Sequence, residues 1–149
     1  MGKELSKQQY GKMVKKASPN SPIITNCIKA FIIGGIICCI GQLINNIYKN
    51  YGFSIEESNT YTSMILIIIS SILTGLGIYS KLGKFAGAGS IVPITGFSNS
   101  VTAPAIEFKK EGFILGLGAK IFIIAGPVIL YGTLTSVIVG AIYYVTTRI

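Results

Sequence analysis

The sequence of 149 residues contains no histidine and no tryptophan, and it has only five acidic residues. Histidine is the commonest general base and a common zinc ligand, so its absence excludes histidine-dependent catalysis and histidine-based metal sites. The three cysteines, Cys27, Cys38 and Cys39, lack metal-ligand spacing and are interpreted as small apolar residues. We therefore expect no enzyme activity, no metal site and no cofactor.

Charge is also scarce: charged residues make up 12% of the chain, against about 25% in a typical soluble domain. Residues 30–48, 58–80, 85–106 and 121–147 carry no charge at all. Half of the residues are apolar, and the mean hydropathy is +0.64. Because a charge at the bilayer centre costs about 2.5–3.5 kcal/mol, this distribution is typical of a chain surrounded by lipid. The net charge of +8 is clustered and accompanies no nucleic-acid-binding motif.

The predicted fold is an all-α polytopic integral membrane protein with about three transmembrane helices and a re-entrant helical hairpin. The helices are expected at about 27–47, 61–79 and 120–144, because about 20 apolar residues span a hydrocarbon core of about 30 Å. A basic N-terminal arm, 1–25, precedes this membrane domain, 26–149.

Residues 85–106 are uncharged but differ from a lipid-facing helix, since they include three glycines, two prolines, three serines, two threonines and one asparagine. Non-helical backbone is tolerated at membrane depth only where protein buries it or it lines a wet cavity. We therefore predict a re-entrant segment of two half-helices within about 85–119; a complete, protein-buried helix and a surface loop remain alternatives. The residues expected to act as hinges or close-packing points, including a kink in the last helix, are Gly87, Gly89, Pro93, Gly96, Pro104, Gly126 and Pro127.

The lysines indicate the orientation of the chain. If the re-entrant segment enters and leaves on one face, eleven of the thirteen basic residues share that face, and only Lys49 and Arg148 lie opposite. The positive-inside rule assigns the basic face, with the N-terminus, to the cytoplasm. A full span over 85–106 would move Lys109 and Lys110 outside and weaken this bias.

Polar side chains within and after residues 85–106 are candidates for lining a solute path. Half-helix N-termini and backbone N–H groups favour anions, and ionisable groups within a membrane are usually functional. The candidate residues are Ser90, Thr95, Asn99, Ser100, Thr102, Glu107, Lys110 and Lys120. Two alternatives remain open. The hydroxyls could instead satisfy backbone groups freed by Pro93 and Pro104, and Glu107 and Glu111 could belong to a surface ion-pair cluster.

The first and last predicted helices share a faint internal similarity. Lys29-Ala-Phe-Ile-Ile-Gly-Gly is followed 91 positions later by Lys120-Ile-Phe-Ile-Ile-Ala-Gly, and at the same offset Gly41 corresponds to Gly132. With the re-entrant topology both helices would point the same way, so a true repeat would be parallel.

The stretch Phe85-Ala-Gly-Ala-Gly-Ser-Ile-Val-Pro-Ile-Thr-Gly-Phe-Ser-Asn-Ser, followed by Ala105-Ile-Glu-Phe-Lys-Lys-Glu-Gly, resembles the signature of the stage V sporulation protein AC/AE membrane family. Asn26-Cys-Ile-Lys-Ala-Phe-Ile-Ile-Gly-Gly and Leu73-Thr-Gly-Leu-Gly-Ile-Tyr are similar to its first and second helices. The resemblance covers roughly residues 19–145, and the length and basic arm fit the AC branch.

The resemblance implies a subunit of the machinery in the inner membrane of the developing endospore. That machinery moves dipicolinic acid, with calcium, into the spore and releases it on germination. The resemblance further implies a channel-forming component that responds to membrane tension. Its partners would be an AE-type membrane protein and a soluble, thiolase-like AD protein, and we expect a homo- or hetero-oligomer. Dipicolinate is a planar dianion, which suits a passage of hydroxyls, amides and backbone N–H groups with lysines at the cytoplasmic mouth.

Two rival hypotheses belong to other functional classes. The first is a non-conducting scaffold that holds partner proteins at the membrane. The second is a membrane enzyme that uses a serine–lysine pair, Ser90 with Lys84 or Lys110.

Overall fold

The computed structural model of the chain describes residues 7–17 and 21–148, and every regular element in these ranges is helical. In chain order the elements are α1 (Lys7–Ala17), α2 (Ile23–Asn50), α3 (Ile55–Gly75), α4 (Ile78–Ala86), η1 (Gly87–Ser90), α5 (Pro93–Glu107), η2 (Phe108–Glu111), η3 (Phe113–Gly118) and α6 (Ala119–Arg148). η1 and η2 are 3₁₀ turns, and η3 is a π-helical turn. The predicted all-α fold class is confirmed.

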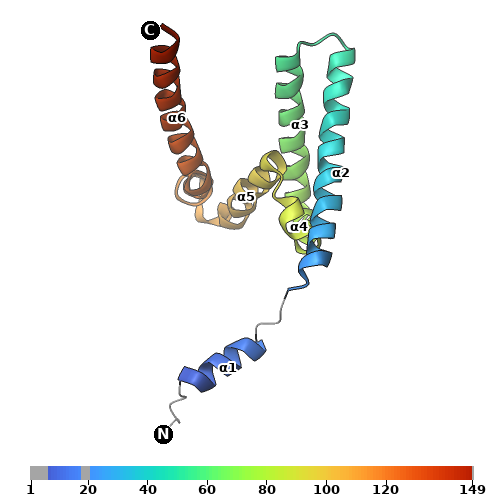
Figure 1. Ribbon diagram of the computed structural model, residues 1–149, viewed down its shortest axis with the longest axis vertical. Coiled ribbons are helices and arrows are strands. Elements are labelled where there is room, and N and C mark those ends of the chain that lie inside the picture. The colour runs from blue at the N-terminus through green and yellow to red at the C-terminus, as the bar shows by residue number, and fades with distance from the viewer. Residues whose placement is uncertain (1–6, 18–20, 149) are drawn as a thin grey trace.

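α2 and α3 form an antiparallel hairpin (Figure 1). Both helices extend beyond the predicted ranges: α2 covers 23–50 rather than 27–47, and α3 begins at Ile55 rather than near 61. Aromatic rings join the two helices at the tip, where Tyr48 and Tyr61 stack at 5.2 Å between centroids. Phe53 meets both rings edge-on, at 5.6 and 5.3 Å. Such pairs contribute about 0.5–1.5 kcal/mol each beyond their burial, so they help to close the hairpin.

A capping box explains the early start of α3. The Ser54 hydroxyl accepts a hydrogen bond from the Glu57 backbone N–H at 3.2 Å, and the Glu57 carboxylate accepts from the Ser54 backbone N–H at 3.0 Å. The Ser54 hydroxyl also donates to the carboxylate at 2.8 Å. The bond from the Ser54 backbone N–H has the largest effect on the Glu57 carboxyl, and together with the bond from the Ser54 hydroxyl it holds the pKa of that carboxyl below its ordinary value of 4.5. Desolvation acts in the opposite direction. Satisfied N–H groups allow the helix to begin in the polar part of the sequence.

We expect Ser54→Ala to destabilise the hairpin by about 1 kcal/mol near neutral pH, since it removes the N-cap acceptor. A carboxyl with a lowered folded-state pKa stabilises the fold above its unfolded value, and that stabilisation is lost as the pH falls through the folded-state pKa. The contribution of Glu57 should therefore decline as the pH falls below 4.5. Thermal unfolding in detergent at pH 7 and pH 3 measures both effects. A Ser54→Ala protein as stable as wild type at pH 7 would contradict the prediction.

The second predicted helix, 61–79, is wrong at its C-terminal end, because the structure breaks it after Gly75. Gly77 has a positive φ of +69°, a backbone conformation that glycine adopts without strain. The helical segment 78–90 then leaves α3 at an angle of 100°. As a result α4 crosses the base of the hairpin rather than continuing toward solvent (Figure 1).

Residues 85–106 do not form two half-helices as predicted; they contain the end of α4, the turn η1 and one helix, α5. Gly87 ends α4 with a positive φ of +53°. Gly89 in η1 is buried against α2, and a Cβ placed on it would lie 2.7 Å from the Ala30 Cα. Pro93 starts α5 at a position where a missing N–H costs nothing. The first part of residues 85–106 is therefore a tight turn and the second part is a helix, because these glycines favour a turn where a first half-helix was predicted.

α5 has 15 residues and a length of about 22 Å, which is less than the hydrocarbon core of about 30 Å. It packs along the second half of α3, while α6 contacts mainly α5 and η3 (Figure 1). Within residues 7–17 and 21–148, two helical stretches are long and apolar enough to cross a membrane, Ile23–Asn50 and Phe113–Thr147. The bent pair Ile55–Gly75 with Ile78–Ser90 makes a third if it is counted as one span.

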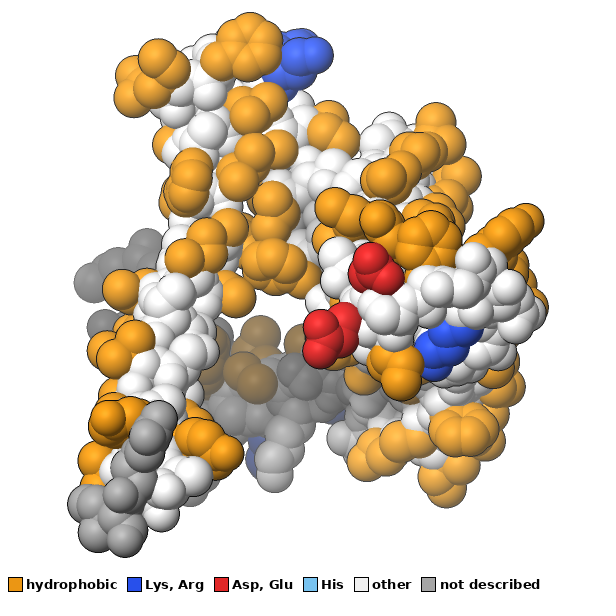
Figure 2. Space-filling model, turned by 90° about the horizontal axis from the view of Figure 1, so that it is seen from above, with side chains coloured by type: hydrophobic (Ala, Val, Ile, Leu, Met, Phe, Trp, Pro, Cys, Tyr) orange, Lys and Arg blue, Asp and Glu red, His pale blue; other side chains and the backbone are white. Residues whose placement is uncertain are grey.

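α6 stands apart from the hairpin, and every described side chain from Pro127 to Thr147 is exposed (Figure 1). Figure 2, which views the molecule from above, shows hydrophobic side chains along the flanks of the helices and charged side chains at a few points. Leu66, Tyr79 and Ala86 are the buried hydrophobic residues of the described chain. So small a core and so much exposed apolar surface fit a protein that buries its surface in lipid and in partner subunits.

Candidate functional site

Hydroxyl and amide side chains fill the interface between the second half of α3 and α5. We call this interface the polar seam; it consists of Ser70, Ser71 and Thr74 of α3 with Thr95, Ser98, Asn99 and Thr102 of α5. The four α5 positions have the spacing of a single helix face. The glycine- and serine-rich sequence of residues 85–106 therefore serves to pack a polar helix face against protein.

Two bonds from side chains to backbone carbonyls fix α5 to α3. The Ser70 hydroxyl donates to the Thr95 carbonyl at 2.7 Å, and the Ser98 hydroxyl donates to the Ile67 carbonyl at 3.1 Å. Ser70, Thr95 and Ser98 are all buried. The Thr95 hydroxyl is also buried but has no hydrogen-bond partner among the described residues. Interhelical hydrogen bonds in membranes contribute about 0.6 kcal/mol on average, so the seam is stable but separable.

The remaining bonds of the seam join side chains to each other. Ser71 Oγ lies 3.0 Å from Ser98 Oγ and 3.1 Å from Thr102 Oγ1. The Thr74 hydroxyl donates to Asn99 Oδ1 at 2.9 Å. All of these groups are uncharged, and most are donors as well as acceptors. If α5 moved away from α3, the seam would present hydroxyl and amide donors to a solute without any carboxylate among them.

The structure brings three of the predicted path residues together and separates two others. Thr95, Asn99 and Thr102 lie on the seam face of α5. The Ser100 hydroxyl donates to a carbonyl three residues earlier on its own helix, at 2.7 Å. Ser90 lies in η1, and its hydroxyl likewise donates three residues back, at 2.9 Å. Neither of these two hydroxyls belongs to the seam.

The charged candidates lie at the junction of α5 with α6. Glu107 and Lys110 are exposed, and Lys120 is half-buried. The Lys120 ammonium lies 3.9 Å from the centroid of the Phe108 ring, a cation–π contact that holds it beside η2. The three charged groups therefore surround the C-terminal end of α5, just beyond the seam.

The two lysines of the internal similarity occupy matching positions. Lys29 lies 5.0 Å over the ring of Phe85, as Lys120 lies over Phe108. α2 and α6, which carry these lysines within their first two turns, run in the same direction (Figure 1). This arrangement is the one that a parallel repeat requires.

The other predicted hinge and packing residues have different surroundings. A Cβ on Gly96 would lie 3.0 Å from the Ser90 carbonyl oxygen, so this glycine allows η1 and α5 to approach. Pro104 lies within α5 and Pro127 within α6, and both helices continue through them. Gly126 has no atom within 4 Å of its Cβ position. In this chain it faces open space, where another molecule can approach.

The α3 side of the seam was not predicted from the sequence. Ser58, Thr62, Ser70 and Thr74 follow one another at multiples of four residues, and three of them are buried. This spacing marks one face of a helix and was visible in the sequence. A second polar contact lies higher on the same face, where the Asn45 amide donates to Asn59 Oδ1 at 2.8 Å.

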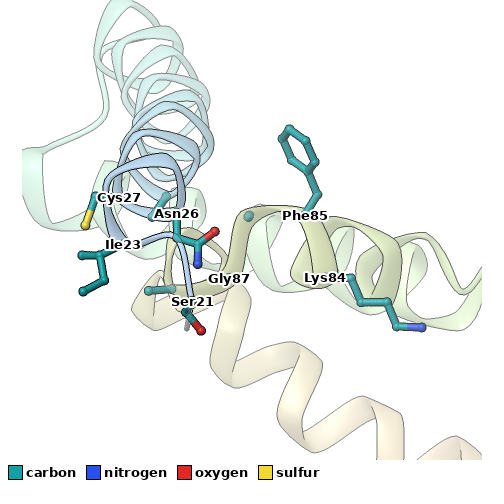
Figure 3. Close-up of a pocket in the computed structure, with 10 residues that line it drawn as sticks. Ser21, Ile23, Asn26, Cys27, Lys84, Phe85 and Gly87 are labelled. Carbon is teal, nitrogen blue, oxygen red and sulfur yellow. The ribbon is translucent and has the colours of Figure 1, made fainter. Parts of the chain in front are cut away.

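A pocket of about 370 Å³ lies at the basic end, between the first turns of α2 and the end of α4. Figure 3 shows the Asn26 side chain between Ser21 and Gly87. The Lys84 side chain extends away from α2 in the same view. The polar groups of this pocket therefore do not converge on one point.

Comparisons with known proteins agree with the helical, lipid-facing architecture. Residues 26–142 match the model of the SpoVAC/SpoVAEB sporulation membrane protein family. Stage V sporulation protein AC of Bacillus subtilis (strain 168) is 45% identical over 139 residues, which cover 93% of each chain. No solved structure matches the chain. On the extent of both matches, the chain belongs to the SpoVAC/SpoVAEB family of sporulation membrane proteins.

Proposed function

We propose that this protein is a subunit of a channel or transporter in the spore inner membrane that moves dipicolinic acid, with calcium, during sporulation and germination. The observation that carries the proposal is the polar seam, a continuous set of uncharged hydrogen-bonding groups between α3 and α5. A dianion needs donors and no carboxylates along its path, and the seam has this composition.

The distribution of lysines also supports an anionic cargo. Lys29, Lys81 and Lys84 lie at the base of the hairpin, at the end where α1 begins the described chain (Figure 1). A cluster of lysines raises the local concentration of anions. We place this end and the N-terminus in the cytoplasm by the positive-inside rule.

The contacts of α6 offer a route by which membrane tension opens the seam. α6 is exposed from Pro127 to Thr147 and contacts mainly α5 and η3, whereas α5 also packs on α3. Lateral force on α6 would therefore load the α3–α5 interface before the α2–α3 hairpin. With two or three spanning segments among its described residues, the chain needs further subunits to enclose a path, and we propose an AE-type membrane protein and a thiolase-like AD protein as partners.

Cysteine accessibility tests the proposal. On a background in which Cys27, Cys38 and Cys39 are alanine, single cysteines are placed through residues 85–119 in membranes of known sidedness. We expect labelling from the cytoplasmic side at Asn99 and Thr102, and we expect dipicolinate to block it.

The control position is Phe97, which is exposed on α5 outside the seam and should not be protected by dipicolinate. If the seam positions stay unlabelled under germination conditions, the conducting hypothesis is overturned. The alternative is then a non-conducting scaffold for partner proteins, which is favoured by one observation, the exposed surface of α6 from Pro127 to Thr147.

A further inference from the structure

A groove of about 570 Å³ runs along one side of the α2–α3 hairpin and reaches the N-terminal end of α5. Its lining changes in character from one end to the other. Near the tip it is lined by Lys49 and Asn59, at mid-depth by Gln42 and Leu66, and farther down by Ile37 and Ile94. A charged and amide-rich mouth followed by an apolar channel is the pattern of a site for an amphiphile.

The length of the groove matches one leaflet of a bilayer. Ile37 lies twelve positions before Lys49 on the continuous helix α2, which corresponds to about 18 Å at 1.5 Å per residue. Half of a hydrocarbon core of about 30 Å is about 15 Å. A chain that begins at Lys49 therefore ends near the bilayer midplane beside Ile37.

The charge of the mouth selects the headgroup. Lys49 is the one charged residue that lines the groove, and it is exposed. The neighbouring carboxylates, Glu56 and Glu57, do not line it, and Glu57 is bonded to Ser54. Asn59 uses its side-chain oxygen to accept from Asn45, so its amide NH₂ group is available as a second donor.

We propose that this groove binds one anionic phospholipid, with its phosphate at Lys49 and Asn59 and one acyl chain along α2 toward Ile37. The lipid belongs to the leaflet on the hairpin-tip side. Its binding does not depend on what passes through the polar seam.

The absence of tryptophan makes the test direct, because a single introduced tryptophan is then the chain's one source of tryptophan emission. Gln42→Trp places the reporter at the rim of the groove. Leu43→Trp, one residue along, places it on the other face of α2 at nearly the same depth. Both proteins are reconstituted with brominated phosphatidylglycerol or brominated phosphatidylcholine, which quench tryptophan on contact.

We expect the Gln42→Trp reporter to prefer the brominated anionic lipid about fivefold, the effect of one lysine near a lipid surface. Adding Lys49→Gln should remove the preference, whereas Lys49→Arg, and Lys84→Gln at the other end of the molecule, should leave it unchanged. Leu43→Trp should show no preference.

Equal quenching of the Gln42→Trp reporter by the two lipids overturns the proposal, because the groove then holds bulk lipid. Loss of quenching by both lipids in the assembled complex also overturns it, because a partner protein then occupies the groove.

Discussion

Replacing Asn99 by aspartate should slow dipicolinate release from spores at least tenfold while leaving the protein assembled. Aspartate has nearly the shape of asparagine, and its carboxylate accepts the hydrogen bond that Thr74 donates to Asn99 Oδ1 at 2.9 Å. The α3–α5 contact is therefore kept, and the new feature is a negative charge on the seam. A dianion that passes this charge is repelled. At an effective dielectric constant of about 20, two unit charges 4 Å apart interact by about 4 kcal/mol, well above the 1.4 kcal/mol that gives a tenfold change in rate.

The measurement is the rate of dipicolinate release after a germinant is added, together with the amount of the variant protein in spore membranes. Asn46→Asp is the matched control, since Asn46 Oδ1 also accepts a side-chain hydrogen bond, here from the Gln42 amide at 2.8 Å, but lies on α2 outside the seam. We expect normal release from the control. Normal release from Asn99→Asp spores that contain the protein would show that the seam is not the path.

The same experiment separates the two functional hypotheses. A scaffold tolerates an isosteric change inside one subunit as long as its partners still bind. If Asn99→Asp slows release only in proportion to a loss of partner proteins from the membrane, the scaffold hypothesis gains support. Thr95, which the sequence analysis also selected, is a poorer test position, because it is buried and a charge there would disturb folding.

Replacing Gly89 by leucine should prevent the protein from accumulating in the membrane. Gly89 is buried where η1 meets α2, and a Cβ there would lie 2.7 Å from the Ala30 Cα and 2.9 Å from its carbonyl carbon. The obstacle is backbone, which cannot rotate away as a side chain does. Overpacking of this kind costs about 1–3 kcal/mol or more. Because Gly89 does not have a positive φ, the effect is one of space alone.

Gly35→Leu is the matched control for this prediction. Gly35 lies on the same helix as Ala30, but nothing lies within 4 Å of its Cβ position. We expect protein levels close to wild type for Gly35→Leu and strongly reduced levels for Gly89→Leu, measured by immunoblotting of membrane fractions and by thermal unfolding of the purified proteins. Equal levels for both variants would mean that η1 does not pack on α2 as described.

Several local features of the fold are encoded in short sequence patterns. Ser54 and Glu57 have the spacing of a capping box, which predicts a helix start at Ile55. The break after Gly75 was harder to anticipate, because the apolar character of the sequence continues through Tyr79. Glycine permits a left-handed backbone conformation at Gly77 but does not require it. The packing of α4 across the hairpin base decides whether the helix breaks there or continues.

The sequence by itself determined that this is an all-α membrane protein, because the free energy cost of placing charge in lipid confines charged residues to the ends of helices whatever the tertiary contacts are. It also determined that residues 85–106 differ from a spanning helix, since their glycines, prolines and hydroxyls suit protein contact rather than lipid. Only the tertiary structure decided what those residues contact. Asn99 pairs with Thr74, 25 residues earlier, and Gly89 packs on Ala30, 59 residues earlier. Hydrogen bonding and close packing are short-range, so they depend on which helices meet in space, and no local spacing encodes that choice.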